Sequence, residues 1–581
     1  MHPASPAPFT APEAVSGAFC FSHPPARLRP PPPFLLPFLR TRPSPARRPL
    51  PVAAAGLLLL LGLAACQPRP PADLVLHNGP EPETIDPHLL TGLADGRIGA
   101  ALFEGLTRFN PTNGGVLPAL AERWELSPDA RTYTFHLRTN AAWSTGETID
   151  AHDLVWSWRR AVDPRTGSDY AGSFLVLRGA EALLAGRERD PATLGVTAAD
   201  RWTVRVGLVN PTPYFPDLAA SRVFAVVPRQ AIERWGDRWT RARPLPCSGT
   251  YSLEEWRVND RMRLVRNPHH WDAPAIRSGV VDVLSGESPG TALNLFLTGA
   301  VDYLADKNMI PTELNDVLRG RADIVSGPSL GSSFVRFNCT RRPFHDARVR
   351  QALCQVVDRR RIVERITRMG EVPSSALVPR GTAGYQPPAG LEQDVARARQ
   401  LLAEAWFPGG RGFPRFEFAF NAGARVFEQI GVELQAMFRE HLGIAMDLRP
   451  LEWKTYLAEM SSRNYDLIRS SWVGDFNDPV TFLEIFHSDS GNNRTGWRSA
   501  PYDALLTEAA ATADPARRHG LLRQAESRLV REEVPILCLY TLVNAFAADP
   551  QRVEGLFANP LDEHPFWAIA RKPGAGGGGR P

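Results

Sequence analysis

Two opposite charges, Arg469 and Asp475, stand at the two ends of one predicted β-strand. Residues 465–473 are rich in apolar and β-favouring side chains, which predicts the strand itself. Because side chains alternate along a strand, both charges are expected on one face, together with Ser471 and Val473 between them. Such a strand could pair its backbone with an extended guest whose charged ends meet the two side chains. The alternative is a core strand that runs into an ordinary turn rich in Asp and Asn.

The end of this strand is marked by turn residues. Gly474 follows the apolar run, and Asn477-Asp478-Pro479 is predicted to turn the chain away. Six positions of strand span about 20 Å at ~3.3 Å per residue. An arginine that reached back along the strand would shorten this to the length of roughly three to five extended peptide residues.

The sequence contains one match to a catalytic motif, but the residues around it cannot supply the chemistry that the motif requires. Gly286-Glu-Ser-Pro-Gly290 matches the G-x-S-x-G pattern of serine hydrolases, but Pro289 follows the serine and has no N–H for an oxyanion hole. A turn that opens a helix is the favoured interpretation, and a secreted hydrolase using Ser288 is the alternative. His269 and His270 are adjacent on a predicted loop, where such pairs are more often surface residues than metal ligands. We therefore expect no catalytic residue, no metal, no cofactor and no enzymatic activity.

Length and charge limit the class of protein. A chain of 581 residues is too long for one hydrophobic core, so two to four domains are expected. The formal charge of +4 comes from residues 1–65, where six arginines face a single glutamate. The rest of the chain is close to neutral, with 60 basic and 61 acidic residues, so the charge gives no reason to expect a nucleic acid partner.

The N-terminus is predicted to carry a secretory signal peptide and a lipid anchor. The apolar run 52–63 is too short to cross a membrane and follows Arg47 and Arg48, which is typical of a secretory signal. It leads into Leu63-Ala-Ala-Cys66, which looks like a bacterial lipobox. We expect residues 1–65 to be a signal peptide with a disordered extension and Cys66 to be lipidated. A plain secretory signal beside a chance cysteine is the alternative.

The signal peptide and lipobox predict a location in the periplasm or at the cell surface, with membrane contact through the lipid anchor only. Residues 66–72 would be the tether that follows the anchor. Export also permits disulfide bonds. The four cysteines of the predicted mature chain allow three complete pairings, between which the sequence cannot choose. They are Cys247, Cys339, Cys354 and Cys538.

Strand and helix patterns alternate along the chain, which predicts an α/β fold with mixed sheets. The expected strands are 73–76, 131–138, 201–208, 249–256, 261–266, 280–284, 415–420, 444–449, 465–473 and 534–546. The expected helical segments are 95–106 with Asp95 as its N-cap, 151–160, 291–298, 346–370, 391–405, 426–442, 453–461 and 514–531.

A series of motifs in one order resembles the periplasmic oligopeptide-binding proteins of ABC importers, the peptide and nickel type of solute-binding protein family 5. The motifs are Glu83-Thr-Ile-Asp-Pro-His88, Leu102-Phe-Glu-Gly-Leu106, Leu117-Pro-Ala-Leu-Ala-Glu-Arg-Trp124, Tyr133-Thr-Phe-His-Leu-Arg138, Trp143-Ser-Thr-Gly-Glu147, Asp153-Leu-Val-Trp-Ser-Trp158, Ser248-Gly-Thr-Tyr251, Arg266-Asn-Pro268, Pro343-Phe-His-Asp-Ala-Arg-Val-Arg-Gln-Ala-Leu353 and Glu452-Trp-Lys-Thr-Tyr456. The opening strand matches the ligand strand of that family, and the resemblance covers nearly the whole predicted mature chain.

The resemblance implies a two-lobed periplasmic binding protein fold with mixed sheets, hinge closure and an additional small α/β domain. The implied boundaries are 73–103, 224–330 and 543–572 for lobe I, 104–223 for the accessory domain, 331–542 for lobe II and 573–581 for a disordered tail. It implies a monomer that captures short peptides and delivers them to the permease subunits of an ABC importer. The alternative is the same fold with another solute, such as a murein peptide, a sugar or a nickel chelate.

The resemblance also assigns site residues. The peptide of that family lies between two strands, which match Gly92-Leu93-Ala94 and Ser471-Trp472-Val473, the latter followed by Gly474. The carboxylate that binds the peptide's α-ammonium group matches Asp475, and an arginine able to meet the peptide's carboxylate matches Arg469. Backbone pairing is independent of side-chain identity, so such a site would give affinity with little sequence specificity.

Two departures from the family pattern bear on the site. Members can carry a disulfide at the positions matching Gly331 and Val473, and both cysteines are absent here. A histidine and a lysine that help to hold peptide carboxylates in relatives are also not evident; the nearby positions are Val426 or Phe427, and Thr367 with Arg368 beside it. The preferred peptide length is therefore left open.

Overall fold

The computed structural model describes residues 70–311, 314–318, 320–422 and 425–574 of the chain. The predicted signal peptide and the lipidation of Cys66 lie outside these residues, as does most of the predicted tail. Within the described ranges, no helix is long and apolar enough to cross a bilayer.

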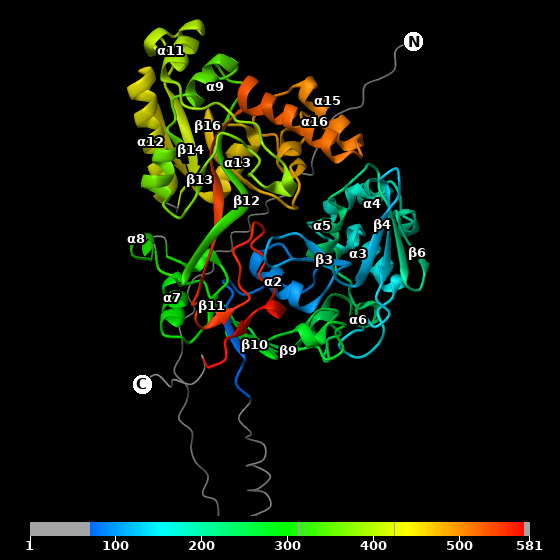
Figure 1. The fold of residues 1–581 in the computed structure, drawn as a ribbon. Coiled ribbons are helices and arrows are strands. Elements are labelled where there is room, and N and C mark those ends of the chain that lie inside the picture. Colours follow the sequence, from blue (N-terminus) through cyan, green and yellow to red (C-terminus); the bar gives the residue numbers. More distant parts are fainter. Residues whose placement is uncertain (1–69, 312–313, 319, 423–424, 575–581) are drawn as a thin grey trace, which may run out of the picture. The chain divides into compact units, whose positions relative to one another are not determined.

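One large sheet is built around two long strands, β12 (Ile324–Phe337) and β17 (Ile536–Ala548), which pair antiparallel over most of their lengths (Figure 1). In the described residues the sheet order is β15-β14-β16-β12-β17-β11-β1-β10-β9-β8, and β13 also pairs with β17. The other strands are β1 (Leu74–His77), β8 (Tyr251–Arg257), β9 (Arg261–Arg266), β10 (Val280–Leu284), β11 (Tyr303–Leu304), β13 (Val372–Pro373), β14 (Phe416–Asn421), β15 (Met446–Leu451) and β16 (Leu467–Val473).

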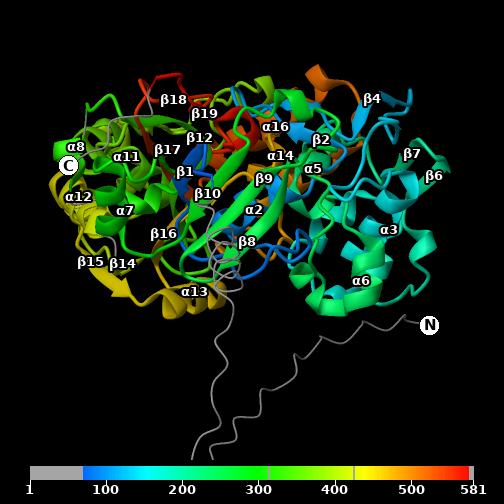
Figure 2. The same ribbon diagram turned by 90° about the horizontal axis from the view of Figure 1, so that it is seen from below.

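This sheet contains both parallel and antiparallel pairs, so the prediction of an α/β fold with mixed sheets is confirmed. β1 runs parallel to β10, whereas β10, β9 and β8 form an antiparallel series that lies side by side in Figure 2. β14 runs parallel to both β15 and β16, while β16 runs antiparallel to β12.

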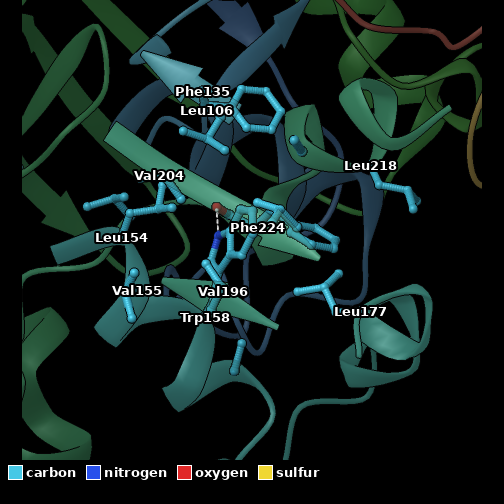
Figure 3. Packing of buried hydrophobic residues seen from close by; sticks show 14 of the residues in the cluster. Leu106, Phe135, Leu154, Val155, Trp158, Leu177, Val196, Val204, Leu218 and Phe224 are labelled. Atoms are coloured by element: carbon cyan, nitrogen blue, oxygen red, sulfur yellow. Dashed lines mark hydrogen bonds between the residues drawn. The ribbon is translucent and has the colours of Figure 1, made fainter. Parts of the chain in front are cut away.

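A second sheet has its own core. Its order is β4-β5-β7-β6, with bounds Ala121–Leu126, Thr132–Leu137, Thr203–Gly207 and Val196–Asp200. The helix α3 (Ala151–Ala161) contributes Trp158, which is fully buried and donates a hydrogen bond from Nε1 to the Phe224 carbonyl oxygen at 2.8 Å (Figure 3). Phe135 of β5 packs into the same cluster. Two short antiparallel pairs complete the strands: β2 (Thr107–Phe109) with β3 (Val116–Pro118), and β18 (Val553–Glu554) with β19 (Ala570–Arg571).

Several helices begin where the sequence supplies a capping side chain. Asp150 and Asp153 form a capping box at the start of α3, and Asp346 caps α9 by accepting from the Arg348 N–H. The remaining helices are α2 (Leu93–Leu102), α4 (Ala180–Leu184), α5 (Phe215–Ala220), α6 (Arg229–Trp235), α7 (Pro289–Leu297), α8 (Asn315–Leu318), α9 (Ala347–Cys354), α10 (Arg359–Ile362), α11 (Val395–Glu404), α12 (Arg425–Leu442), α13 (Trp453–Ser462), α14 (Val480–Leu483), α15 (Ala500–Ala511) and α16 (Pro515–Ser527).

The predicted helical region 346–370 is not one helix. α9 ends at Cys354, and Asp358 then caps α10 by accepting a hydrogen bond from the Arg361 N–H at 3.0 Å. A π-helical turn over Val363–Thr367 follows directly. An aspartate inside an apolar helical pattern offers the backbone an alternative partner, and here that partner starts a new helix.

The four cysteines whose disulfide pairing the sequence could not predict are all free thiols. Cys247, Cys354 and Cys538 are buried, and burial raises the pKa of Cys247 and of Cys354 to about 12. None of the three possible disulfide pairings is formed. Their role in this fold is that of small apolar side chains.

Candidate functional site

The strand β16 leaves part of its backbone unpaired. β12 pairs with it along its whole length, from Leu467 to Val473, but β14 pairs only with Leu467 and Ile468. Across the described parts of the chain, no other strand joins the β14 side of β16. An edge is therefore open beyond Ile468, where a further strand could add.

The hydrogen-bond pattern shows which residues face this edge. The Gly474 N–H donates to the Leu330 carbonyl oxygen of the neighbouring chain segment at 2.7 Å, so the backbones of Trp472 and Ser470 also point toward β12. The N–H and C=O groups of Ser471 and Val473 then point the opposite way, toward the open edge.

Helix α13 covers the start of this edge. The Tyr456 hydroxyl donates to the Arg469 carbonyl oxygen at 2.6 Å, which confirms that odd-numbered residues of β16 face away from β12. The uncovered backbone begins after this contact, at Ser471. Burial decreases in the same direction, because Leu467 and Ile468 are fully buried whereas Val473 is 56% exposed.

The Arg469 guanidinium lies over an aromatic ring and has no acidic partner. Its central carbon is 4.0 Å from the centroid of the Phe427 ring on α12. Its Nε atom is buried and has no hydrogen-bond acceptor. Among the described residues, no carboxylate forms an ion pair with Arg469. A buried donor on a cation without an acceptor is costly, and an incoming carboxylate would satisfy it.

Asp475 likewise has no cationic partner in the described ranges. Its side chain is exposed to solvent, yet the surrounding protein displaces enough water to raise the carboxyl pKa, against a lowering effect of the Thr481 hydroxyl. The Asp475 N–H donates to Thr481 Oγ1 at 3.1 Å, which fixes the turn after β16. This carboxylate is available to an external cation.

A second aspartate on the same turn is fully neutralised. Asp478 is buried and accepts two hydrogen bonds from Arg518, at 2.7 and 2.8 Å. Two further acids lie close to it. Glu484 is exposed to solvent, yet the surrounding protein displaces enough water to raise its pKa, and the charges of Asp475 and Asp478 raise this pKa further, to about 7. Burial and the Asp478 charge raise the pKa of Asp217 to about 7.

Aromatic contacts hold this turn against the segment that carries Asp217. The Phe476 ring stacks on Tyr214 with centroids 4.3 Å apart and an interplanar angle of 6°. The Arg518 guanidinium also lies over the Tyr214 ring, 5.7 Å from its centroid. On β16 itself, the Trp472 indole Nε1 is a buried donor without an acceptor. The site thus combines free backbone groups, a free cation, a free anion and an unused indole donor.

Comparison with known proteins decides the family. The family model for the middle part of bacterial extracellular solute-binding proteins, family 5, matches residues 115–494. The chain is 33% identical to the periplasmic oligopeptide-binding protein OppA of Salmonella typhimurium over 84% of this chain and 90% of that protein. It is 34% identical to the periplasmic murein peptide-binding protein MppA of Escherichia coli over 84% of this chain and 91% of that protein.

The chain belongs to family 5 of the bacterial extracellular solute-binding proteins.

Solved structures agree with this assignment. The unliganded open form of the murein tripeptide-binding protein MppA superposes with a TM-score of 0.76 at 32% identity, covering 86% of this chain and 97% of that one. Haemophilus influenzae OppA in complex with the peptide RPPGFSPFR gives a TM-score of 0.68 at 28% identity, over 86% and 98% of the two chains. The fold of this family 5 protein is therefore the two-lobed periplasmic binding protein fold.

One of the two predicted ligand strands is not a strand. Leu93 and Ala94 lie in the first turn of α2, and only Gly92 before it is extended, with φ −90° and ψ 158°. The helical periodicity explains the error, because Ala94, Ile98 and Leu102 recur at four-residue spacing and are all buried. The helix also begins earlier than predicted. Gly92 holds the N-cap position, and Asp95 lies inside the first turn.

Gly331 and Val473, the positions at which relatives can carry a disulfide, are directly opposite in the β12–β16 pair. They form a non-hydrogen-bonded pair, the kind in which the Cα atoms of neighbouring strands are closest. A Cβ added to Gly331 would lie 2.9 Å from Leu542 Cδ1 and 3.3 Å from Val473 Cγ2. The structure thus places the two positions side by side, and here the side chains of Val473 and Leu542 fill the space between them.

The rejected motifs have structural roles. Ser288 caps α7 by accepting a hydrogen bond from the Thr291 N–H, and Pro289 is the first residue of that helix. This confirms the favoured interpretation of the G-x-S-x-G match as a turn that opens a helix. His270 is buried and shares a hydrogen bond with Glu104 at 3.2 Å, so it is not a surface residue.

Sequence reasoning missed Phe427 as a partner of Arg469. From the sequence, Phe427 is only one of two positions near the one that matches a histidine of the resembled family. An aromatic residue 42 positions from an arginine carries no local signal of a cation–π contact.

Proposed function

We propose that this chain is an extracytoplasmic receptor that captures short peptides and delivers them to the permease of an ABC importer. The observation that carries the proposal is the open edge of β16, with Arg469 near one end, Asp475 beyond the other, and neither charge neutralised by a described residue. The relatives named oligopeptide-binding and murein peptide-binding proteins support the same class of ligand.

In this proposal the peptide adds as an extra strand to β16. Its amide groups pair with the backbones of Ser471 and Val473, which supply affinity without reading side chains. Its α-ammonium group meets Asp475, and its carboxylate meets Arg469. Hydrogen bonds to charged groups contribute about 1.5–3 kcal/mol each, so both ends favour free rather than blocked termini.

Gly92-Leu93-Ala94 is proposed to meet the peptide from the facing side, as the start of a helix rather than as a strand. Leu93 is 52% exposed and offers an apolar contact. This contact needs closure of lobe I onto lobe II, a hinge motion around the bound peptide. The β12–β17 pairing shifts register between Pro328 and Ser332, next to the predicted lobe boundary at 330/331. Such an irregularity is a suitable place for a hinge.

Location and anchoring belong to the same proposal. The chain would be exported, lipidated at Cys66 and held at the membrane by that lipid, acting as a monomer without enzymatic activity. Labelling of cells with a radioactive fatty acid tests the anchor. The wild-type chain should incorporate label, and Cys66→Ser should not; equal labelling of both would reject the anchor.

A murein peptide is the second candidate ligand, favoured by the likeness to MppA in sequence and structure. Such a ligand also presents amide groups, a free amine and carboxylates. It is distinguished from a linear peptide by direct competition between the two.

The decisive experiment is calorimetry on protein that has been unfolded and refolded to remove any carried ligand. Tri-, tetra- and pentapeptides with free termini should bind, and N-acetylation should weaken them at least tenfold. Binding that survives acetylation would reject the role of Asp475. Unchanged peptide after long incubation would exclude hydrolysis at Ser288, and a murein tripeptide that outcompetes all linear peptides would favour the second candidate.

A further inference from the structure

We propose that Phe427 is a positioning residue that sets specificity for the ligand's carboxylate by fixing the Arg469 guanidinium on its ring. The inference rests on the proposed function and deepens it. It gives a role to a side chain that can neither donate a hydrogen bond nor carry a charge.

The ring is held in place by the protein. Phe427 is the third residue of α12, and its partly buried side chain packs against the core cluster that includes Phe418 and Leu434. The ring therefore offers a fixed surface, from which the Arg469 guanidinium carbon lies 4.0 Å away. The backbone of Arg469 is fixed as well, through the hydrogen bond from Tyr456 to its carbonyl oxygen.

The Arg469 guanidinium hydrogen-bonds the Tyr456 hydroxyl but keeps a further in-plane donor without a partner. Nε is buried without an acceptor, and no carboxylate of the described residues reaches the guanidinium. A ring that covers one face blocks approach from that side. The N–H groups lie in the plane of the guanidinium, so a carboxylate that meets its open edge can form two parallel N–H···O bonds. Phe427 thereby selects an anionic ligand group with planar, bidentate geometry.

This mode of recognition should not depend on pH near neutrality. The titratable groups that sense the Arg469 charge are Tyr456 on α13 and Tyr540 on β17, and burial raises the pKa of both hydroxyls. Glu371 is a further acid close to Tyr540. A phenylalanine adds no group that titrates between pH 5.5 and 8.5, whereas a histidine at this position would.

The test compares one tetrapeptide as free acid and as C-terminal amide, by calorimetry at pH 7.5. In the wild type the free acid should bind more tightly, and their affinity ratio measures carboxylate recognition. Phe427→Leu should lower this ratio about three- to tenfold, the size of a partly desolvated cation–π contact. The amide affinity should stay within twofold. Phe427→Trp keeps a ring face and should keep the ratio.

A ratio in Phe427→Leu equal to that of the wild type would overturn the inference. Absence of any peptide binding to the wild type would instead reject the proposed function, so the two failures are distinguishable. If Phe427→Leu does not fold, Phe427→His supplies a second test. Its ratio should rise as the pH falls from 8 to 5.5, whereas the wild-type ratio stays constant. A wild-type ratio that changes more than threefold over this range would also overturn the inference.

Discussion

Asp475 and Asp478 are three residues apart on one turn, but their surroundings are opposite. Asp478 is buried and accepts two hydrogen bonds from Arg518, whose side chain is only 4% exposed. Asp475 is exposed and has no cationic partner among the described residues. The first aspartate is part of the protein's structure, and the second is free to act on something outside it.

Two arginines show the same contrast between a paired and an unpaired charge. Arg518 is paired with a carboxylate, while Arg469 lies on an aromatic ring with a buried Nε that has no acceptor. A paired buried charge contributes little net stability, but removal of one partner leaves the other uncompensated at a cost of about 3–5 kcal/mol. An unpaired charge beside an open strand has no such role, so its removal should affect binding rather than folding.

The largest effect is expected at Asp478. Asp478→Asn should lower the free energy of unfolding by about 3–5 kcal/mol, because it leaves Arg518 buried without a counter-charge. Guanidinium unfolding followed by circular dichroism measures this. The matched control is Asp475→Asn, which should change stability by less than about 0.5 kcal/mol. Equal losses in both variants would contradict the distinction between the two aspartates.

The next effect concerns binding. Asp475→Asn should weaken a peptide with a free amino terminus at least tenfold, which is about 1.4 kcal/mol. The N-acetylated form of the same peptide should bind the variant and the wild type alike, since it brings no ammonium group to this position. Calorimetry with both peptides checks this. A parallel loss for free and acetylated peptides would show that Asp475 acts through structure.

The smallest effect is a pH dependence through Glu484, whose pKa is raised to about 7 by the loss of water around it and by the neighbouring acids. Below this pH the carboxyl gains a proton and loses its attraction for a nearby ammonium group. Peptide affinity should therefore fall about two- to fivefold from pH 8 to pH 6, the size of one partly screened charge. By linkage, binding near pH 7 should release protons.

Calorimetry in buffers of different ionisation enthalpy detects this release. The titratable and charged groups around Glu484 are Asp475, Asp478 with its partner Arg518, Tyr214 and Tyr502. Glu484→Gln should flatten the pH dependence between 6 and 8. If peptide affinity still changes with pH in this variant, the proton released on binding comes from another group, and Asp217 is the first to test.

The sequence by itself determined the features that depend on near neighbours. β16 and the turn after it follow from alternating β-favouring residues and from Gly474, and the helix starts at Asp346 and Ser288 follow from capping side chains. The rejection of a nucleophilic serine followed from one missing N–H at Pro289. These features need only the geometry of a few consecutive residues.

Only the tertiary structure decided which charges are free. The partner of Asp478 is 40 positions away and the ring under Arg469 is 42 positions away, so nothing local distinguishes Asp475 from Asp478. The structure also placed Leu93 and Ala94 in a helix, since α2 is buried over nearly its whole length and this packing outweighs a match to a ligand strand. Pairing between distant residues is set by how strands and helices pack, and that information is spread over the whole chain.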